Sequence, residues 1–256
     1  MSGPQAKGAA LVTGAGLRLG RAMALALAEK GFAVAVHYNK SEAPAREVFD
    51  LIASKGGKAA AVSADLSKES ETASLIARAS AALGPLSLLV NSASVFEADE
   101  IATMSRESWD LHLETNLRAP AKLAQDFAAQ AQAGADSLIV NLIDQRVLKP
   151  TPQFLSYTVS KAALFALTKT LAQALGPKGV RVNAIGPGPT MKNARQSEED
   201  FRRQNEATIL GRGAAPADIV GALLYLVDAT AVTGQMIAVD GGQHLAWKTP
   251  DVLVSE

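Results

Sequence analysis

The sequence predicts one α/β domain, in which helices cover both faces of a doubly wound parallel sheet. Short apolar runs alternate with helical segments along the whole chain of 256 residues, as expected when each strand is followed by a crossover helix. A Gly-rich turn separates the first apolar run from the first helix, and no change in composition marks a linker. We therefore treat residues 1–256 as one domain, with residues 1–7 flexible, 190–208 a substrate loop and 244–256 a tail.

The composition argues against several functional classes. Hydrophobic residues make up 48% of the chain and aromatic residues 5%, so the core is built from Ala, Val, Leu and Ile. Lys plus Arg equals Asp plus Glu, at 25 each, which gives no reason to expect a nucleic-acid or membrane partner. There is no Cys, and the three His (His37, His112, His244) are not spaced as metal ligands. The chain also lacks a signal-peptide profile and any apolar run near ~18 residues, which predicts a cytoplasmic protein.

The first strand, turn and helix form a candidate phosphate site. The strand Ala9 to Thr13 runs into a Gly-rich turn, and a helix over Arg21 to Lys30 follows. Glycines let the backbone approach a ligand closely, and a helix N-terminus offers free N–H groups to a phosphate. A second strand, Phe32 to His37, completes a βαβ unit. This order of elements favours dinucleotide binding over a turn that only connects strand to helix. The residues assigned to the cofactor here are Gly14, Arg18 and Leu19.

The end of the second strand favours NADPH over NADH. An NAD-preferring site carries an acidic residue there, which accepts from the ribose 2′-OH, and this chain has none. Charge-assisted hydrogen bonds to a 2′-phosphate contribute roughly 1.5–3 kcal/mol each. Lys40 and Ser41, taken singly, fit a solvated loop equally well. The residues assigned to this end of the cofactor are Arg18, His37, Tyr38, Asn39, Lys40 and Ser41.

The strand–helix pattern then repeats. It gives helix 42–55, strand Lys58–Ser63, helix 69–83 and strand Ser87–Asn91. Asp65 and Leu66 follow the third strand, where an adenine edge can be read, although Asp65 also fits a helix cap. The small residues Asn91, Ser92 and Ala93 follow the fourth strand, where a cofactor can lie against the sheet edge.

A helix from Glu107 to Ala131 carries two unusual interior residues. Pro120 should kink this helix and free backbone carbonyls for a chain of water molecules. Asn116 needs hydrogen-bonding partners if it faces inward, and the alternative is that it faces solvent. The helix therefore predicts either a polar connection near the site or a solvated surface.

The segment from Asn141 to Leu171 carries the candidate chemistry. A buried strand, Ser137 to Leu142, leads through a polar loop into a helix that begins near Pro152 to Phe154. Tyr157 and Lys161 lie four residues apart and share one helix face. A neighbouring cation lowers the pKa of a phenol from roughly 10, which suits a proton donor to an atom that receives a hydride. Asp144 lies just past the carboxyl end of the strand.

The remaining elements complete the sheet. They are a strand over Val180–Ile185, a rigid turn over Gly186–Thr190, a polar mobile stretch to Ala207, a helix over Pro216–Asp228 and a strand over Met236–Asp240. Ligands of such sheets bind outside the carboxyl ends of the strands, near the switch point beside strand one. Pro187 and Gly188 lie at that edge and are assigned to the cofactor. His244 and Trp247 in the tail are candidates for the substrate pocket.

Motifs spread over about residues 8–245 together resemble the short-chain dehydrogenase/reductase family. They are Thr13-Gly14-x-x-x-Arg18-x-Gly20, Asn91-x-Ala93, Asn116, Tyr157-x-x-x-Lys161, Pro187-Gly188 and Val239-Asp240-Gly241-Gly242. The resemblance implies a Rossmann-type sheet of seven parallel strands that binds NAD(P), and a homotetramer built through the helices of Asn116 and Tyr157. It also implies that Tyr157 donates a proton and that Asn116 supports a water relay. Lys161 would lower the Tyr157 pKa and hold the nicotinamide ribose.

The chain departs from the common family pattern at two positions, and in both it resembles the pteridine reductase branch. Dihydromonapterin reductases look similar as well. Arg18 replaces the usual middle glycine, and Asp144 replaces the usual catalytic Ser. The segments ALVTGAGLRLGRA, HYNKS and NSASVF also resemble that branch. The resemblance implies that Ser94 and Phe96 contact a pterin, and that Phe96 stacks the bicyclic ring against the nicotinamide.

The carboxylate of Asp144 makes reduction the expected activity. Close to Tyr157 it raises the phenol pKa, against the effect of Lys161. It can also accept from a ring N–H or pass a proton through water to a ring nitrogen. We therefore predict an NADPH-dependent reductase of a C=N bond in a pteridine of biopterin, monapterin or folate type. The alternatives are a short-chain carbonyl reductase for another small substrate and a non-catalytic NADP-binding scaffold or sensor; Asp144 also fits a turn cap.

Overall fold

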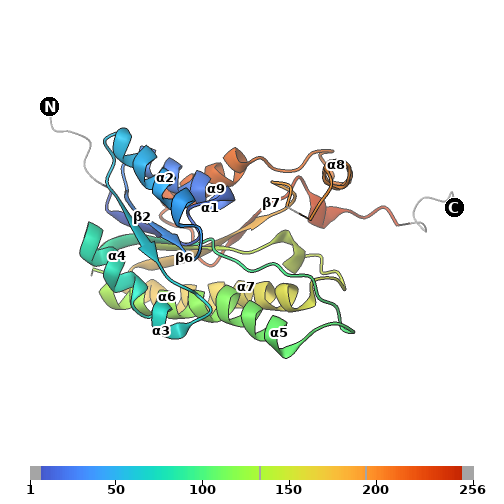
Figure 1. Ribbon diagram of the computed structural model, residues 1–256, viewed down its shortest axis with the longest axis horizontal. Coiled ribbons are helices and arrows are strands. Elements are labelled where there is room, and N and C mark those ends of the chain that lie inside the picture. The colour runs from blue at the N-terminus through green and yellow to red at the C-terminus, as the bar shows by residue number, and fades with distance from the viewer. Residues whose placement is uncertain (1–6, 133, 194, 250–256) are drawn as a thin grey trace.

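The computed structural model describes residues 7–132, 134–193 and 195–249. Seven strands within these residues form one parallel sheet in the order β3-β2-β1-β4-β5-β6-β7 (Figure 1). The strands are β1 Ala9–Val12, β2 Ala33–Tyr38, β3 Ala59–Ser63, β4 Leu86–Asn91, β5 Ser137–Leu142, β6 Val180–Pro187 and β7 Met236–Val239. The predicted doubly wound fold is confirmed, and every predicted strand is present.

Helices cover both faces of this sheet (Figure 1). One face carries α1 Arg18–Glu29, α2 Glu42–Ser54 and α9 Pro216–Asp228, and the other carries α4 Leu75–Leu83, α6 Ala119–Gln130 and α7 Leu155–Leu175. Neighbouring residues of a strand point to opposite faces, so Leu11 packs with the second group while Ala10 and Val12 pack with the first. The strands are therefore apolar on both faces, which explains why they read as continuous apolar runs.

The strand order places the switch point between β1 and β4. The chain winds outward from β1 to β2 and β3, then returns to place β4 on the other side of β1. The loops that follow β1 and β4 therefore diverge at the carboxyl edge of the sheet. This divergence opens the crevice in which sheets of this kind bind ligands.

The helix expected over residues 107–131 has three parts, and its irregular turn precedes Pro120. They are α5 Arg106–Leu113, the π-helical turn η1 Glu114–Arg118 and α6. Pro120 lies in the first turn of α6, where a missing N–H is tolerated. The irregularity therefore comes from the π turn before the proline. The π turn carries Asn116, which is fully buried, so a solvent-facing Asn116 is ruled out.

Two other segments differ from the prediction. The helix expected over 69–83 is divided into α3 Glu69–Thr72 and α4. The polar stretch before Ala207 contains α8 Glu198–Glu206, whose first turn holds three acidic residues and whose N-cap Ser197 accepts from the N–H of Asp200. Acidic residues favour a helix N-terminus because they complement its dipole. Residues 1–6 of the expected flexible start, residue 194 of the expected substrate loop and residues 250–256 of the expected tail lie outside the described residues.

The helices are too short or too polar to cross a lipid bilayer within the described residues. A spanning helix needs about 20 mostly apolar residues. In the described parts of the chain, no helix combines the necessary length with the necessary apolar character.

Candidate active site

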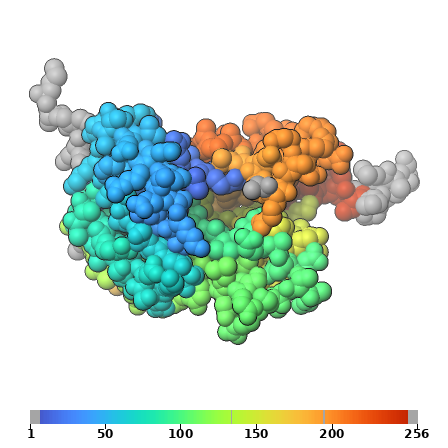
Figure 2. Space-filling view, in the orientation of Figure 1, coloured from blue at the N-terminus to red at the C-terminus, as the bar shows by residue number. Residues whose placement is uncertain are grey.

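A pocket of about 780 Å³ opens at the carboxyl ends of the central strands. Its walls come from the Gly-rich turn before α1, the ends of β2 and β4, the loop after β5, helix α7 and the segment after β6. Figure 2 shows the surface hollowed between the blue N-terminal part of the chain and the orange segment near residue 200. The pocket therefore occupies the crevice expected at the switch point.

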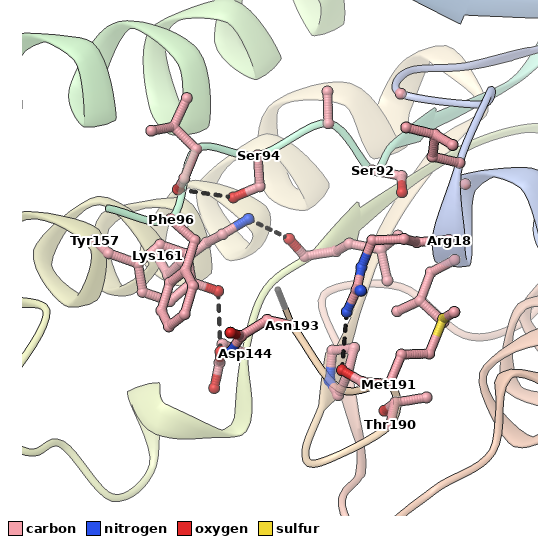
Figure 3. A pocket seen from close by; sticks show the side chains of 18 of the residues that line it. Arg18, Ser92, Ser94, Phe96, Asp144, Tyr157, Lys161, Thr190, Met191 and Asn193 are labelled. Carbon is pink, nitrogen blue, oxygen red and sulfur yellow. Dashed lines mark hydrogen bonds between the residues drawn. The ribbon is translucent and has the colours of Figure 1, made fainter. Parts of the chain in front are cut away.

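Tyr157 and Asp144 form a hydrogen-bonded pair in the wall of this pocket (Figure 3). The phenol O–H of Tyr157 donates to Oδ2 of Asp144 at 2.9 Å, and Oδ1 of the carboxylate accepts from the N–H of Arg146 at 2.8 Å. Burial raises the pKa of Tyr157 well above its usual value, and the charge of Asp144 raises it further. Tyr157 is therefore protonated at neutral pH, as a proton donor must be.

Lys161 lies one helical turn beyond Tyr157 and lines the same pocket. Its Nζ donates to the carbonyl oxygen of Leu142 at 2.8 Å and lies 5.8 Å from the centre of the Tyr157 ring. Burial lowers the pKa of Lys161 to about 8, against the opposing charge of Asp144. The expected lowering of the Tyr157 pKa by Lys161 is not found, because burial and Asp144 dominate the phenol.

Asn116 ties the segment after β4 to helix α7. Its Nδ2 donates to the carbonyl oxygen of Val95 and to Oγ of Ser160, both at 3.0 Å. Its Oδ1 accepts from the N–H of Val95 at 2.8 Å and from Oγ of Ser94 at 3.1 Å. The amide thereby uses both donors and both acceptor positions. Asn116 fixes the wall that carries Ser94 from behind and does not itself line the pocket.

The Gly-rich turn and the start of α1 form a cradle that fits a phosphate. Gly14 has φ +66°, and a Cβ there would lie 3.1 Å from Cα of Ala93, so a larger residue would disturb this close approach. In the part of the chain that the structure describes, no side chain caps α1, and the N–H groups of residues 18–20 have no acceptor. Free donors at the positive end of a helix dipole attract anions. The cradle therefore fits the pyrophosphate of a dinucleotide.

The other end of the pocket lies beside β2 and β3. His37 is buried; its Nδ1 accepts from the N–H of Gly14 at 3.0 Å, and its Nε2 donates to the carbonyl oxygen of Ala64 at 3.1 Å. Burial lowers the pKa of His37 to about 4, so the ring is neutral and joins the Gly-rich turn to the sheet. The carboxylate of Asp65 accepts from the N–H and Oγ of Ser67, at 3.0 and 2.7 Å, and closes the turn after β3; the N-cap of α3 is Lys68, so Asp65 is not the helix cap of the alternative interpretation.

Known proteins match this chain over nearly its whole length. The family model described as enoyl-(acyl carrier protein) reductase matches residues 14–244. The 3-oxoacyl-[acyl-carrier-protein] reductase FabG of Staphylococcus epidermidis is 32% identical over 240 residues, which cover 92% of this chain and 98% of that protein. The chain belongs to the short-chain dehydrogenase/reductase family. It is an oxidoreductase of this family, and the resemblance stated from the sequence is confirmed.

Two solved structures from this family illustrate the range of its relatives. FolM alternative dihydrofolate reductase 1 from Brucella canis, complexed with NADP, superposes with a TM-score of 0.93 at 44% identity and covers 96% of this chain and 98% of its own. Landomycin C-6 ketoreductase LanV, with bound NADP and rabelomycin, has a TM-score of 0.84 at 28% identity and covers 94% of this chain and 97% of its own. Reductases of different substrates thus share this fold.

Most of the residues that the sequence analysis assigned to the site do line this pocket. They are Gly14, Arg18, Leu19, His37, Tyr38, Asn39, Ser41, Asp65, Leu66, Ser92, Ala93, Ser94, Phe96, Asp144, Tyr157, Lys161, Pro187 and Gly188. Lys40 is exposed and lies outside the lining, and Asn91 is buried behind it, where its Nδ2 donates to Oδ1 of Asn141 at 2.8 Å. Neither residue contacts the pocket, and Asn116 supports the wall from behind.

Arg18 lines the pocket, as expected of a cofactor residue, and also makes a contact that the sequence did not predict. The residue adopts φ +49°, and its guanidinium donates to the carbonyl oxygens of Met191 and Lys192, both at 2.9 Å (Figure 3). Arg18 therefore holds the segment after β6 across the pocket. The sequence gives no signal for this contact, because the partners are backbone atoms more than 170 residues away.

Phe96 lies at the Tyr157 end of the pocket, together with residues that the sequence did not single out. Its ring stacks on Phe154, with centroids 4.2 Å apart and planes at 11°, and meets the edge of Tyr157 at 4.6 Å. The guanidinium of Arg195 lies 5.7 Å from the Phe96 ring and donates to the Phe96 carbonyl oxygen. The Phe96 ring, with Phe154 stacked behind it, and the Arg195 cation therefore lie at this end, beside the phenol of Tyr157.

The other conspicuous His and Trp residues lie away from the pocket. His112 is fully buried, with its ring nitrogens bonded to the carbonyl oxygen of Ser108 at 2.7 Å and the N–H of Glu97 at 3.1 Å. His244 bonds to Asp240 at 2.6 Å, and Trp247 is 59% exposed. Neither tail residue lines the pocket of its own chain.

Proposed function

We propose that this protein is an NADPH-dependent reductase of pteridines or dihydropteridines, with Tyr157 as the proton donor. The observation that carries the proposal is the hydrogen bond of 2.9 Å from the Tyr157 phenol to Asp144, at the position where most family members carry a Ser. The identity of 44% with a structure described as an alternative dihydrofolate reductase supports the same assignment.

The chain offers a consistent site for NADPH, which would supply the hydride. The Gly14 turn and the N–H groups of residues 18–20 would hold the pyrophosphate. At the end of β2, the polar residues Tyr38, Asn39 and Ser41 line the pocket without an acidic side chain, which favours a 2′-phosphate over a free 2′-OH. Lys161 would hold the nicotinamide ribose.

Reduction of a C=N bond consumes a hydride at carbon and a proton at nitrogen. The Tyr157 O–H supplies the proton, because its raised pKa keeps it protonated until the nitrogen becomes basic. The ammonium of Lys161, 5.8 Å from the phenol ring centre, then stabilises the tyrosinate that remains. Burial also raises the pKa of Asp144, so this carboxyl can share a proton with Tyr157 and with a ring nitrogen of the substrate.

A carbonyl reductase is the second candidate, and the curated relatives favour it. The 3-oxoacyl-[acyl-carrier-protein] reductase of Staphylococcus epidermidis is 32% identical to this chain, and a ketoreductase shares its fold. The same phenol can protonate a ketone oxygen in place of a ring nitrogen. A short-chain 3-oxoacyl thioester is therefore the competing substrate class.

The proposal is tested by following the loss of NADPH absorbance with dihydrobiopterin, dihydromonapterin and dihydrofolate, and with an acetoacetyl thioester. We expect turnover of at least one pteridine, and loss of this turnover by about 10²-fold or more in Asp144→Ser. The same variant is expected to retain or gain activity on the thioester. Thioester turnover without pteridine turnover by the unmodified protein would establish the second candidate instead.

The expected homotetramer and cytoplasmic location stay predictions. Leu111 of α5 and Val159 of α7 are each 39% exposed and lie on helices that the family resemblance assigns to a subunit interface. Burial of such side chains between subunits stabilises an oligomer.

A further inference from the structure

Phe154 adopts a backbone conformation that is rare for an aromatic residue. It is the N-cap of α7, with φ 57° and ψ 51°, and the next two N–H groups, of Leu155 and Ser156, donate to the carbonyl oxygen and the carboxylate of Asp99 at 3.2 and 3.0 Å. Apart from glycines, the described residues contain one other positive φ, at Arg18. The left-handed region brings Cβ close to the carbonyl oxygen and disfavours bulky side chains. Contacts of the Phe154 ring, together with the bonds to Asp99, therefore hold the residue there.

The ring of Phe154 contacts Phe96 from the segment after β4 and Arg146 from the loop after β5. It stacks on Phe96 at 4.2 Å with nearly parallel planes. The guanidinium of Arg146 lies 5.3 Å from the centre of the Phe154 ring, and its Nη1 donates to Oγ1 of Thr151 at 2.5 Å. Stacked rings and a cation over a ring face are attractive arrangements. They compensate for the unfavourable φ of Phe154.

The two stacked rings differ in their position relative to the pocket. Phe96 lines the pocket, whereas Phe154 does not. The segment that carries Phe96, between β4 and α5, has no regular secondary structure that would fix the plane of its ring. Phe154, anchored at the first turn of α7, backs the Phe96 ring against the helix that carries Tyr157.

We propose that Phe154 is a positioning residue that fixes the plane of Phe96, so that the pocket selects substrates with a flat conjugated ring. Such a ring stacks on a fixed aromatic plane without ordering that plane first. A flexible acyl chain gains little from it. This inference rests on the proposed function and deepens it, since the pteridine bicycle is such a ring.

A pair of variants separates the ring from the backbone conformation. Phe154→Gly and Phe154→Ala both remove the ring, but Gly accommodates φ 57° and Ala does not. We expect both variants to raise the ratio of the KM for dihydrobiopterin to the KM for an acetoacetyl thioester about fivefold. The Gly variant should melt at a higher temperature than the Ala variant. Phe154→Tyr, which keeps the ring, should restore the ratio found for the unmodified protein.

A binding measurement gives the same comparison without turnover. The fluorescence of oxidised biopterin is quenched on stacking, so its titration with the protein alone reports the Kd. We expect the Kd to rise about fivefold in both the Gly and the Ala variants and to stay unchanged in Phe154→Tyr. An unchanged Kd and KM ratio in the Gly variant would overturn the inference. So would effects that follow melting temperature, with Ala impaired and Gly intact, because they would reveal a purely structural role.

The design separates failure of this inference from failure of the proposed function. If the unmodified protein neither binds nor reduces any pterin, the proposed function fails. The comparison then passes to a flat bicyclic ketone, such as 1-indanone, against the thioester. A selective loss of the bicyclic ketone in both variants supports the role of Phe154, and an equal loss of both substrates overturns it.

Discussion

Lys161 holds a charge in surroundings that disfavour it. The side chain is 2% exposed, its Nζ donates to one carbonyl oxygen, and burial lowers its pKa from 10.5 to about 8. At neutral pH it is charged in the folded and in the unfolded protein, so the folded state carries the full desolvation penalty. The residue that would stabilise the tyrosinate during turnover therefore weakens the fold between turnovers.

Replacement of Lys161 by Met should reveal this penalty. We expect Lys161→Met to abolish turnover and to raise the free energy of unfolding at pH ~7 by about 1–2 kcal/mol, after the loss of the bond to the Leu142 carbonyl is subtracted. The gain should shrink as the pH rises from about 8 to 10.5, because the folded protein then releases the proton first. Urea unfolding across this range measures it. A variant that is less stable at every pH would contradict the prediction.

At the scale of single residues, the sequence identifies the candidate catalytic groups. It does not show which of their opposing effects on the Tyr157 pKa is larger. The four-residue spacing of Tyr157 and Lys161 places both on one helix face, and Asp144 follows the strand beside them. The sign of the Tyr157 pKa shift depends on how deeply the phenol is buried and on a distance of 2.9 Å to Asp144. Neither quantity can be read from spacing along the chain.

His37 joins three elements through one neutral ring. It lies in β2, accepts from the N–H of Gly14 in the turn before α1, and donates to the carbonyl oxygen of Ala64 after β3. Protonation of Nδ1 removes the acceptor for Gly14. The attachment of the phosphate cradle to the sheet thus depends on an uncharged imidazole.

Acidification should therefore weaken the fold through His37. The folded pKa is about 4 and the usual value is 6.5, so the unfolded chain takes up the proton first. This contribution is complete above about pH 6.5, and about 3 kcal/mol is lost as the pH falls to about 4. Denaturant unfolding at several pH values measures the slope. His37→Asn should be less stable at neutral pH but flatter in this range; an equally steep variant would assign the slope to other groups.

The sequence predicts those elements whose residues carry a clear hydrophobic pattern, and it misses those whose residues do not. The strands are short apolar runs, and their order with the helices gives the sheet directly. The π turn at Glu114–Arg118 differs from an α-helix by a single extra residue per turn, and Pro120 draws attention to the wrong position. Helix α8 consists of polar and charged residues without an apolar stripe, so periodicity does not reveal it.

The whole molecule assembles its site from segments that are distant in the chain. The parallel sheet brings the ends of β1, β2, β4, β5 and β6 to one edge, which the sequence predicts from the strand order alone. The contact between Arg18 and the carbonyl oxygens of Met191 and Lys192 crosses this edge, and no pattern in the sequence announces it. The site is therefore predictable as a location and less so as a set of contacts.

The absence of an acidic side chain at the β2 edge should control the choice of cofactor. We expect Asn39→Asp to lower the ratio of kcat/KM with NADPH to kcat/KM with NADH by about tenfold or more, because a carboxylate repels a 2′-phosphate and accepts from a 2′-OH. Steady-state rates with both nucleotides measure the ratio. Asn39→Ala removes the amide without adding a charge and serves as the control. An equal change in both variants would show that charge at this position is unimportant.

The order of the strands in the sheet also determines which part of the sheet can form first during synthesis on the ribosome. The first four strands form one half of the sheet by themselves, and β5, β6 and β7 then add one after another at a single edge. Arg18 is made 173 residues before Met191, an interval of roughly 10–35 s at ~5–20 residues per second. Once β4 and Ala93 have been made, the parts of the phosphate cradle are all present but uncovered. A nascent chain can therefore meet a dinucleotide before the segment that encloses it has been synthesised.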